Sequence, residues 1–240
     1  MCGIIGFTGR KPAKDILIDG LERLEYRGYD SAGIALLNDD DTLTIRKKAG
    51  RVSELRELCK DGDYSSTCGI GHTRWATHGG VTDANAHPHR CGNVALIHNG
   101  IIENYSDIIR EYGLADKLVS ETDSEVVAAL LDTLYDGDPI AAIRKAVKII
   151  AGSFALCIMF ADRPGIIYAV RNVSPMVAAH SEEGSIIASD LTAIISFSKD
   201  YFVVPEYHIL TMTQEGIRVE DLKGNEVKPQ MLEITWDITA

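Results

Sequence analysis

The chain has 240 residues, 45% of them hydrophobic and 25% charged, and its formal net charge is −11. This acidic balance argues against a nucleic-acid partner, because phosphate binding needs clustered Lys and Arg side chains. No apolar run approaches the roughly eighteen residues of a membrane span, and no signal peptide is recognised at the start, so we expect a cytoplasmic protein with no membrane partner.

The first part of the chain is predicted to contain both strands and helices. Residues 2–9 alternate as a strand does. Residues 12–28 are predicted to be a helix, with a proline near the start and apolar side chains at helical spacing. Residues 33–50 are predicted to form a hairpin around an Asn-Asp-Asp-Asp turn. A short helix at 52–60 and a strand that ends as a loop at 67–80 follow.

The second part begins with residues 93–104, predicted to be a strand that runs into a tight turn at its Asn-Gly pair. The capping-box spacing of Thr122 and Glu125 predicts a helix start, and the next helix begins near Pro139. After residue 150 the pattern changes to a series of short strands. These elements indicate a single domain of the α+β class with antiparallel sheets, rather than repeating βαβ units.

Five cysteines are dispersed along the chain without a CxxC pair. Such a set is unlike a secreted disulfide framework, so Cys59, Cys68 and Cys157 are interpreted as small buried apolar residues. Cys2 differs because it directly follows Met1. Removal of Met1 would place an α-amine with a pKa of about 7.7–8.0 beside a thiol with a pKa of about 8.5, which pairs a base with a nucleophile. The alternative is that Cys2 is an ordinary strand residue.

A second polar segment, residues 24–35, contains Arg27 and Asp30 beside glycines where a helix should give way to a strand. A functional role is one interpretation of these charges. A polar helix exit with a salt bridge is the other, and composition does not separate the two.

The densest cluster of hydrogen-bonding side chains is residues 71–89, which hold four of the seven histidines. Paired glycines next to a tryptophan suggest that residues 74–80, called the flap here, are mobile. His87, His89 and Cys91 would share one face of a strand and could bind a metal. No CxxC or HExxH frame accompanies them, so we prefer hydrogen-bonded structural histidines and expect no metal.

Two further candidates follow. Asn99 and Gly100 offer a carboxamide and a backbone N–H, the donors that an oxyanion hole uses, although Asn-Gly is also the usual signal of a type I′ turn. The helical pattern after them mildly favours the functional interpretation. Asp123 at a helix start would be stabilised by the helix dipole and could also pair with an ammonium group.

The order of these segments carries a specific resemblance. MCGIIG, RLEYRGYDSAG, GIGHTRWATHG with NAHPH, HNGIIEN and SETDSEV together closely resemble the glutaminase domain of glutamine–fructose-6-phosphate aminotransferases. The likeness implies an N-terminal-nucleophile fold, a four-layer α/β/β/α sandwich with two stacked antiparallel sheets. It spans residues 2–235 as one glutaminase domain, and residues 236–240 are expected to begin a linker to an absent sugar-phosphate isomerase part.

The resemblance also implies a reaction. Cys2 would attack the side-chain amide of L-glutamine and release ammonia and then L-glutamate by way of a thioester. Asn99 and Gly100 would hold the oxyanion, and Arg27 with Gly28 would support the nucleophile. In the full-length enzyme the ammonia would convert fructose 6-phosphate to glucosamine 6-phosphate, and no cofactor is implied for the glutaminase step.

The remaining implied roles concern the bound glutamine. Arg74 would hold its α-carboxylate through a bidentate contact, and Asp123 would pair with its α-ammonium. Trp75 would close over the ligand. Three more residues would complete the site, with Thr77 and His78 at the carboxylate end and His87 supporting the flap.

Two alternatives stay open at this point. If Met1 is retained, the Cys2 nitrogen is an amide that cannot act as a base, and the chain would be a glutamine-binding module without turnover. The glutaminase domain could also belong to an amidotransferase of the purine or asparagine type. Those families share the Cys-Gly start but are expected to differ in EYRGYDS and TRWATHG.

Overall fold

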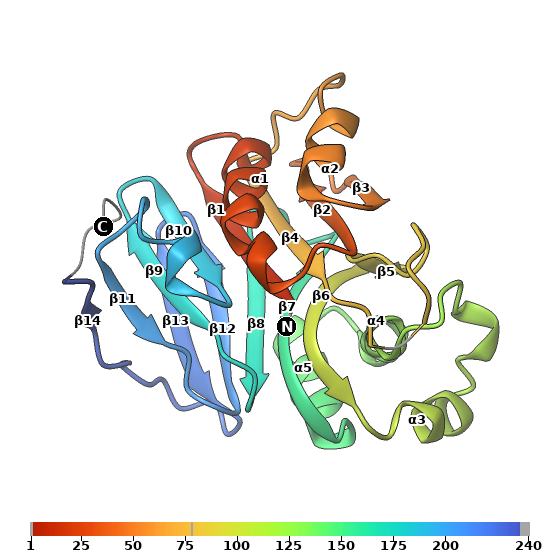
Figure 1. Cartoon of the computed structure of the whole chain (residues 1–240). Coiled ribbons are helices and arrows are strands. Elements are labelled where there is room, and N and C mark those ends of the chain that lie inside the picture. The colour runs from red at the N-terminus through yellow and green to blue at the C-terminus, as the bar shows by residue number, and fades with distance from the viewer. Residues whose placement is uncertain (1, 78, 236–240) are drawn as a thin grey trace.

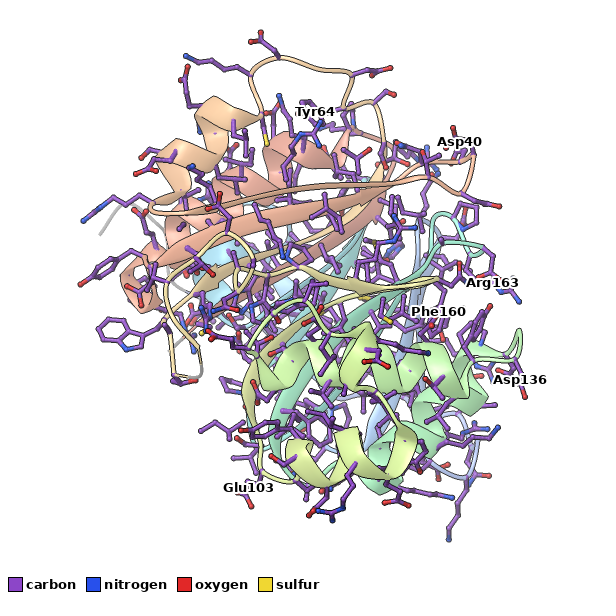
Figure 2. All side chains as sticks on the ribbon, turned by 90° about the vertical axis from the view of Figure 1, so that its right-hand side faces the viewer. Asp40, Tyr64, Glu103, Asp136, Phe160 and Arg163 are labelled. Carbon is purple, nitrogen blue, oxygen red and sulfur yellow. The ribbon has the colours of Figure 1, made fainter. Side chains whose placement is uncertain are left out.

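The computed structural model describes residues 2–77 and 79–235. They form two antiparallel sheets stacked face to face, with helices on both outer faces (Figure 1, Figure 2). The predicted α+β class and its four layers are confirmed. The predictions for Met1, His78 and residues 236–240 fall outside the described residues. None of the described helices has the length and apolarity needed to span a bilayer.

The first sheet has the strand order β14-β11-β9-β10-β1-β4-β2-β3 among the described residues. Its strands are β1 (Gly3–Gly9), β2 (Ser31–Leu37), β3 (Leu43–Ala49), β4 (Cys68–Arg74), β9 (Val177–Ser181), β10 (Gly184–Ala188), β11 (Asp200–Val203) and β14 (Leu232–Glu233). The second sheet has the order β13-β12-β8-β7-β6-β5. Its strands are β5 (His89–Cys91), β6 (Val94–Ile102), β7 (Gly152–Phe160), β8 (Ile167–Asn172), β12 (His208–Thr213) and β13 (Gly216–Asp221).

Helices α1 (Ala13–Leu24) and α2 (Val52–Leu58) cover the first sheet. Helices α3 (Tyr105–Tyr112), α4 (Asp123–Leu134) and α5 (Pro139–Ile149) cover the second. Three short 3-10 helices complete the description, namely η1 (Glu25–Arg27), η2 (Ala115–Lys117) and η3 (Leu191–Ala193).

Three hydrophobic clusters fill the spaces between the four layers. Strand β1 contributes to two of them, because successive strand side chains point to opposite faces of a sheet. Ile5 and Phe7 pack towards α1, and Ile4 packs into the space between the sheets. Cys68 and Cys157 are buried in that same space, which confirms their interpretation as core residues.

A capping box at the start of α4 would have two hydrogen bonds between Thr122 and Glu125, and one of them is present. The Glu125 N–H donates to the Thr122 Oγ1 at 3.2 Å, as expected. The Glu125 carboxylate instead accepts hydrogen bonds from the backbone N–H groups of Val119 and Ser120. Its side chain therefore fixes the loop that leads into α4.

The predicted tight turn at Asn99 and Gly100 is wrong. Strand β6 continues to Ile102 and stays paired with β7 over this whole stretch, with Gly100 opposite Phe154. Gly100 has a φ of +130°, and a Cβ there would lie 2.0 Å from the Ser153 carbonyl oxygen. The glycine thus permits an unusual strand conformation and a close backbone approach, not a hairpin.

Strand pairing brings the candidate residues to one place. Strands β1 and β4 are antiparallel with Gly3 opposite Thr73, so Cys2, the residue just before β1, lies beside the end of β4. Strand β6 belongs to the other sheet, and its Asn99 donates a hydrogen bond to the Cys2 carbonyl oxygen at 2.9 Å. The candidate site therefore lies where the two sheets meet.

Candidate active site

Cys2 is partly buried, and its Sγ accepts a hydrogen bond from the Trp75 N–H at 3.2 Å. Burial raises the pKa of the thiol, and the Trp75 hydrogen bond and the charge of Arg74 oppose this rise without cancelling it. The thiol is therefore protonated at neutral pH. A base must take its proton before it can act as a nucleophile.

Arg27 lies beside Cys2 on the wall of the same cavity. Its buried guanidinium donates from Nη1 to the Ser189 carbonyl at 3.1 Å and to Asp190 Oδ2 at 3.0 Å. The Tyr26 hydroxyl donates to the same Asp190 oxygen at 2.9 Å. Asp190 thus fixes the position of Arg27 next to Cys2, and sequence reasoning missed Asp190 because no local pattern links it to Arg27.

Gly28 and Asp30 determine how β4 gives way to the flap. A Cβ on Gly28 would lie 2.9 Å from the Arg74 carbonyl carbon and from the Trp75 nitrogen, so this close approach requires glycine. Asp30 donates its N–H to the Arg74 carbonyl at 3.0 Å and accepts from the Ala76 N–H at 2.9 Å. The segment from Gly28 to Asp30 therefore holds the backbone that presents an N–H to Cys2.

Arg74 ends β4, and its buried guanidinium contacts the flap. It donates to the Gly80 carbonyl at 3.0 Å and to the Gly79 carbonyl at 3.5 Å. The Asn85 side chain donates to the Gly80 carbonyl and to Glu121 Oε2, both at 3.0 Å. This end of the flap is thus tied both to the predicted carboxylate-binding arginine and to the loop before α4.

Trp75 stands at the other end of the flap with 47% of its surface exposed. Its ring meets the Tyr29 ring edge to face, with centroids 5.8 Å apart. The indole therefore lies at the mouth of the site rather than in the core, a position from which it could cover a ligand.

Asp123, the first residue of α4, is buried, and its Oδ2 accepts the Ile102 N–H at 2.8 Å. Arg74 faces the same small cavity. Burial lowers the pKa of Arg74, and the nearby negative charges, including that of Asp123, oppose this shift. A guanidinium remains charged at any working pH, so the cavity carries one positive and one negative group.

Two adjoining cavities meet at Cys2. The smaller, about 20 Å³, is lined by Cys2, Arg74, Trp75, Thr77, His87, His98, Gly100, Thr122, Asp123 and Ser124. The larger, about 320 Å³, is lined by Cys2, Arg27, Trp75, Thr77, Asn99, Gly100, Ile101, Ser153, Ser174 and Pro175. The smaller cavity is narrow between Arg74 and Asp123 and shares Cys2, Trp75, Thr77 and Gly100 with the larger one.

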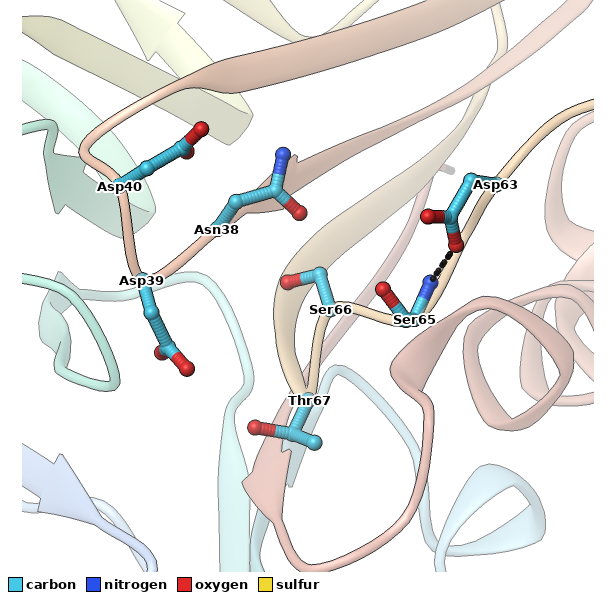
Figure 3. A pocket seen from close by; sticks show the side chains of 7 residues that line it. All are labelled: Asn38, Asp39, Asp40, Asp63, Ser65, Ser66 and Thr67. Atoms are coloured by element: carbon cyan, nitrogen blue, oxygen red, sulfur yellow. Dashed lines mark hydrogen bonds between the residues drawn. The ribbon is translucent and has the colours of Figure 1, made fainter.

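A third cavity of about 490 Å³ lies at the opposite end of β4 (Figure 3). The β2–β3 turn and the segment that leads into β4 form it, and Figure 3 shows one internal bond, from the Ser65 N–H to Asp63 Oδ1 at 3.1 Å. Three carboxylates, an amide and three hydroxyls line it. These residues supply no thiol or imidazole, whereas the Cys2 thiol lines both of the other cavities.

The buried histidines form a contiguous group behind the smaller cavity. The rings of His72 and His87 are stacked with centroids 4.1 Å apart, and His87 meets His89 edge to face at 4.5 Å. Burial lowers the pKa of His72 to about 3 and holds the pKa values of His87 and His89 well below the ordinary value. All three are therefore neutral at working pH.

The interpretation of His87 and His89 as hydrogen-bonded residues holds for one of them. His89 Nε2 lies 2.9 Å from the Thr122 Oγ1. Neither ring nitrogen of His87 has a hydrogen-bond partner within the described residues, so this interpretation is wrong for His87, which is held by ring contacts. In residues 2–77 and 79–235, no three His, Cys, Asp or Glu side chains are grouped closely enough to hold a metal.

The family comparison agrees with this arrangement. Residues 72–196, more than half of the chain, match the model of a family described as the glutamine amidotransferase domain. The chain belongs to this family. Over its whole length it is 41% identical to glutamine–fructose-6-phosphate aminotransferase [isomerizing] of Clostridium tetani and 42% identical to one of Thermus thermophilus. The chain spans 40% of the length of each of these two proteins.

The fold of this amidotransferase domain is similar to that of solved structures. Glutamine phosphoribosylpyrophosphate amidotransferase from B. subtilis superposes with a TM-score of 0.80 at 24% identity, covering 94% of this chain and 50% of that one. A structure described as the allosteric regulatory enzyme of purine biosynthesis superposes with a TM-score of 0.81 at 25% identity. The match covers 93% of this chain and 50% of that one. The expected N-terminal-nucleophile fold is therefore confirmed.

Proposed function

We propose that this amidotransferase domain hydrolyses the side-chain amide of L-glutamine to L-glutamate and ammonia through a thioester on Cys2. One observation carries the proposal. Cys2, Asn99, Arg74 and Asp123, from separate elements of the chain, surround two adjoining cavities. This set provides a nucleophile, an oxyanion donor and one charge for each end of an amino acid.

The nucleophilic step requires a base because the buried thiol is protonated. Once Met1 is removed, the α-amine of Cys2 has a pKa near 7.7–8.0 and can take the thiol proton. The sulfur then bonds to the amide carbon, and the protonated amine gives its proton to the departing nitrogen as the C–N bond breaks. Water attacks the thioester next, which releases glutamate and restores the thiol.

The oxyanion that forms in both steps needs hydrogen-bond donors. The Asn99 carboxamide has two N–H groups, and one of them bonds to the Cys2 carbonyl oxygen. The second, with the backbone N–H of Gly100, is assigned to the oxyanion. Removing one such donor typically costs about 3 kcal/mol of transition-state stabilisation. Arg27 and Gly28 support this side of the nucleophile.

The free amino-acid end of glutamine is assigned to the smaller cavity. Arg74 binds the α-carboxylate in place of the Gly79 and Gly80 carbonyls, with Thr77 and His78 beside it, and Asp123 pairs with the α-ammonium. Trp75 covers the bound substrate and His87 supports the flap from behind. Local charge complementarity explains how a chain of net charge −11 recognises a zwitterion without a basic field.

The use of the ammonia is proposed from the relatives. We assign residues 2–235 to one glutaminase domain and residues 236–240 to the start of a linker. In a longer protein of this kind, a sugar-phosphate isomerase part uses the ammonia to convert fructose 6-phosphate to glucosamine 6-phosphate. The 41–42% identity to those aminotransferases, against 24–25% to the purine-type structures, favours this acceptor over the purine type.

Glutamate release from glutamine tests the proposal. We expect Cys2-dependent turnover by a preparation whose N-terminal residue is Cys2, and none by Cys2→Ala. The intact mass of the protein separates catalysis from mere binding, because a chain that retains Met1 should bind glutamine but turn over far more slowly. Equal rates in Cys2→Ala and the wild type would disprove the assignment of the nucleophile.

A further inference from the structure

His72 lies in the middle of β4 and is fully buried. Its Nε2 is 3.0 Å from the His98 carbonyl oxygen and 3.0 Å from Asn99 Oδ1. Both partners belong to β6 in the opposite sheet. The His72 ring, in the first sheet, therefore contacts Asn99, the residue of the second sheet that carries the proposed oxyanion donor.

The chemistry of these contacts fixes the position of the protons. A backbone carbonyl oxygen can only accept a hydrogen bond, so the His72 Nε2 that contacts the His98 carbonyl must carry the hydrogen. The Asn99 atom that faces the same nitrogen must then be the amide oxygen. An Asn99 amide turned by 180° would set its N–H groups against the His72 N–H, donor against donor.

These contacts give the Asn99 side-chain amide a single orientation. With Oδ1 held by His72, Nδ2 must point to Cys2, where it donates to the Cys2 carbonyl at 2.9 Å. We propose that His72 is a positioning residue that sets the orientation of the Asn99 amide and so aligns the oxyanion donor before substrate arrives. This inference rests on the proposed glutaminase function and gives His72 a role in the same site.

The surroundings keep His72 in that state. Stacking against His87 fixes the ring plane, and the His72 Nδ1 has no hydrogen-bond partner in the part of the chain that the structure describes. Burial lowers the pKa of the His72 imidazole to about 3, so the ring is neutral above that pH. The donor orientation should therefore not change across the pH range in which the domain works.

The first test replaces His72 with a residue of similar size that has no N–H donor. His72→Phe keeps an aromatic ring but cannot donate to Asn99. We expect kcat to fall roughly tenfold to a hundredfold, less than the roughly hundredfold to thousandfold loss caused by removing a whole oxyanion donor. The KM for glutamine should stay within about twofold, because Arg74 and Asp123 are untouched. Thr73→Val is the matched control, since the buried Thr73 Oγ1 next to His72 has no hydrogen-bond partner among the described residues.

A double-mutant cycle separates positioning from general support of the fold. If His72 acts through Asn99, adding His72→Phe to Asn99→Ala should cause no further loss of kcat. Losses that multiply would overturn the inference. His72→Gln restores an N–H donor of similar reach and should recover much of kcat, which keeps the test decisive if the Phe variant does not fold. A Gln variant as slow as Asn99→Ala would also overturn it.

The same assays distinguish this inference from the proposed function. A wild-type domain without Cys2-dependent glutamate release would remove the proposed function and the inference with it. Normal Cys2-dependent turnover, combined with multiplicative losses in the cycle, would remove the inference alone. Unchanged kcat in His72→Phe would likewise reject the positioning role while leaving Cys2 as the nucleophile.

Discussion

Arg27 and Asp190 form a hydrogen-bonded ion pair at 3.0 Å although 163 positions separate them in the chain. Arg27 follows α1, and Asp190 follows β10, the strand next to β1. The pair is therefore possible only because β10 pairs with β1 and leaves its end beside the residue that precedes β1. Through this pair Asp190 holds the guanidinium that lines the larger cavity next to Cys2.

Asp190→Asn should lower the free energy of unfolding by about 2 kcal/mol, the usual value of a hydrogen bond to a charged group. Burial raises the pKa of Asp190, but the Thr192 and Tyr26 hydrogen bonds and the charge of Arg27 outweigh it, so the folded pKa is lowered. A carboxylate of this kind stabilises the fold above its unfolded pKa of about 3.9 and loses that contribution as pH falls through the folded pKa.

Denaturant unfolding at several pH values measures this contribution. The difference between wild type and Asp190→Asn should be constant above about pH 5 and shrink below about pH 4. A difference that persisted unchanged at about pH 2, below the usual carboxylate range, would contradict the role of the ionised carboxylate.

Gly28→Ala should destabilise the domain by roughly 1–3 kcal/mol, because its Cβ would meet the backbone of Arg74 and Trp75. Glutaminase activity should fall as well, since that backbone presents the N–H that contacts Cys2 Sγ. Gly216→Ala is a matched control, because no heavy atom of the described residues lies within 4 Å of a Cβ built there. Thermal unfolding and glutamate release measure both effects, and equal stability of the two variants would contradict the steric argument.

Arg74→Lys should raise the KM for glutamine by at least about tenfold and change kcat little, because a lysine cannot form the bidentate contact that a carboxylate accepts from a guanidinium. Steady-state kinetics with the α-carboxamide derivative of glutamine provide the control. That derivative lacks the α-carboxylate, so its kcat/KM should depend far less on the substitution. An equal penalty for both substrates would place Arg74 elsewhere in the mechanism.

Lys47→Met should raise the KM and lower the melting temperature, because Lys47 organises the segment that carries Asn85 and His87. Its Nζ donates to the carbonyl oxygens of Ala84, Ala86 and Pro88 at 3.1, 2.8 and 3.3 Å. The neighbouring Lys48 is 3.7 Å from Asp83 on an exposed face, and Lys48→Met should have little effect on either quantity. Similar losses in the two variants would contradict this assignment.

Alkylation of Cys2 should report its raised pKa. In protein that retains Met1, the iodoacetamide reaction rate at Cys2 should increase with pH up to an inflection above that of free cysteine, because burial disfavours the thiolate. Peptide mass spectrometry separates Cys2 from Cys91, the other partly buried cysteine. An inflection below the free-cysteine value would mean that the Trp75 N–H and Arg74 dominate over burial.

The sequence predicted the elements well wherever the signal was local. Asp138 caps α5 by accepting the Ala141 N–H at 3.0 Å, one residue before the proline expected at the helix start. Thr122 caps α4 as its spacing indicated. The Asn-Gly pair misled the prediction because the same residues serve two purposes, and a hairpin turn and a strand that needs a positive φ both favour glycine.

The sequence by itself determined the α+β class, the helix starts, the alternation of core residues and the candidate chemistry of Cys2, because these depend on side chains a few positions apart. Tertiary structure decided that Asp190 holds Arg27, that Asp30 holds the root of the flap and that His72 faces the Asn99 oxygen. Such contacts depend on which strands become neighbours, and strand pairing joins segments whose spacing along the chain carries no periodic signal.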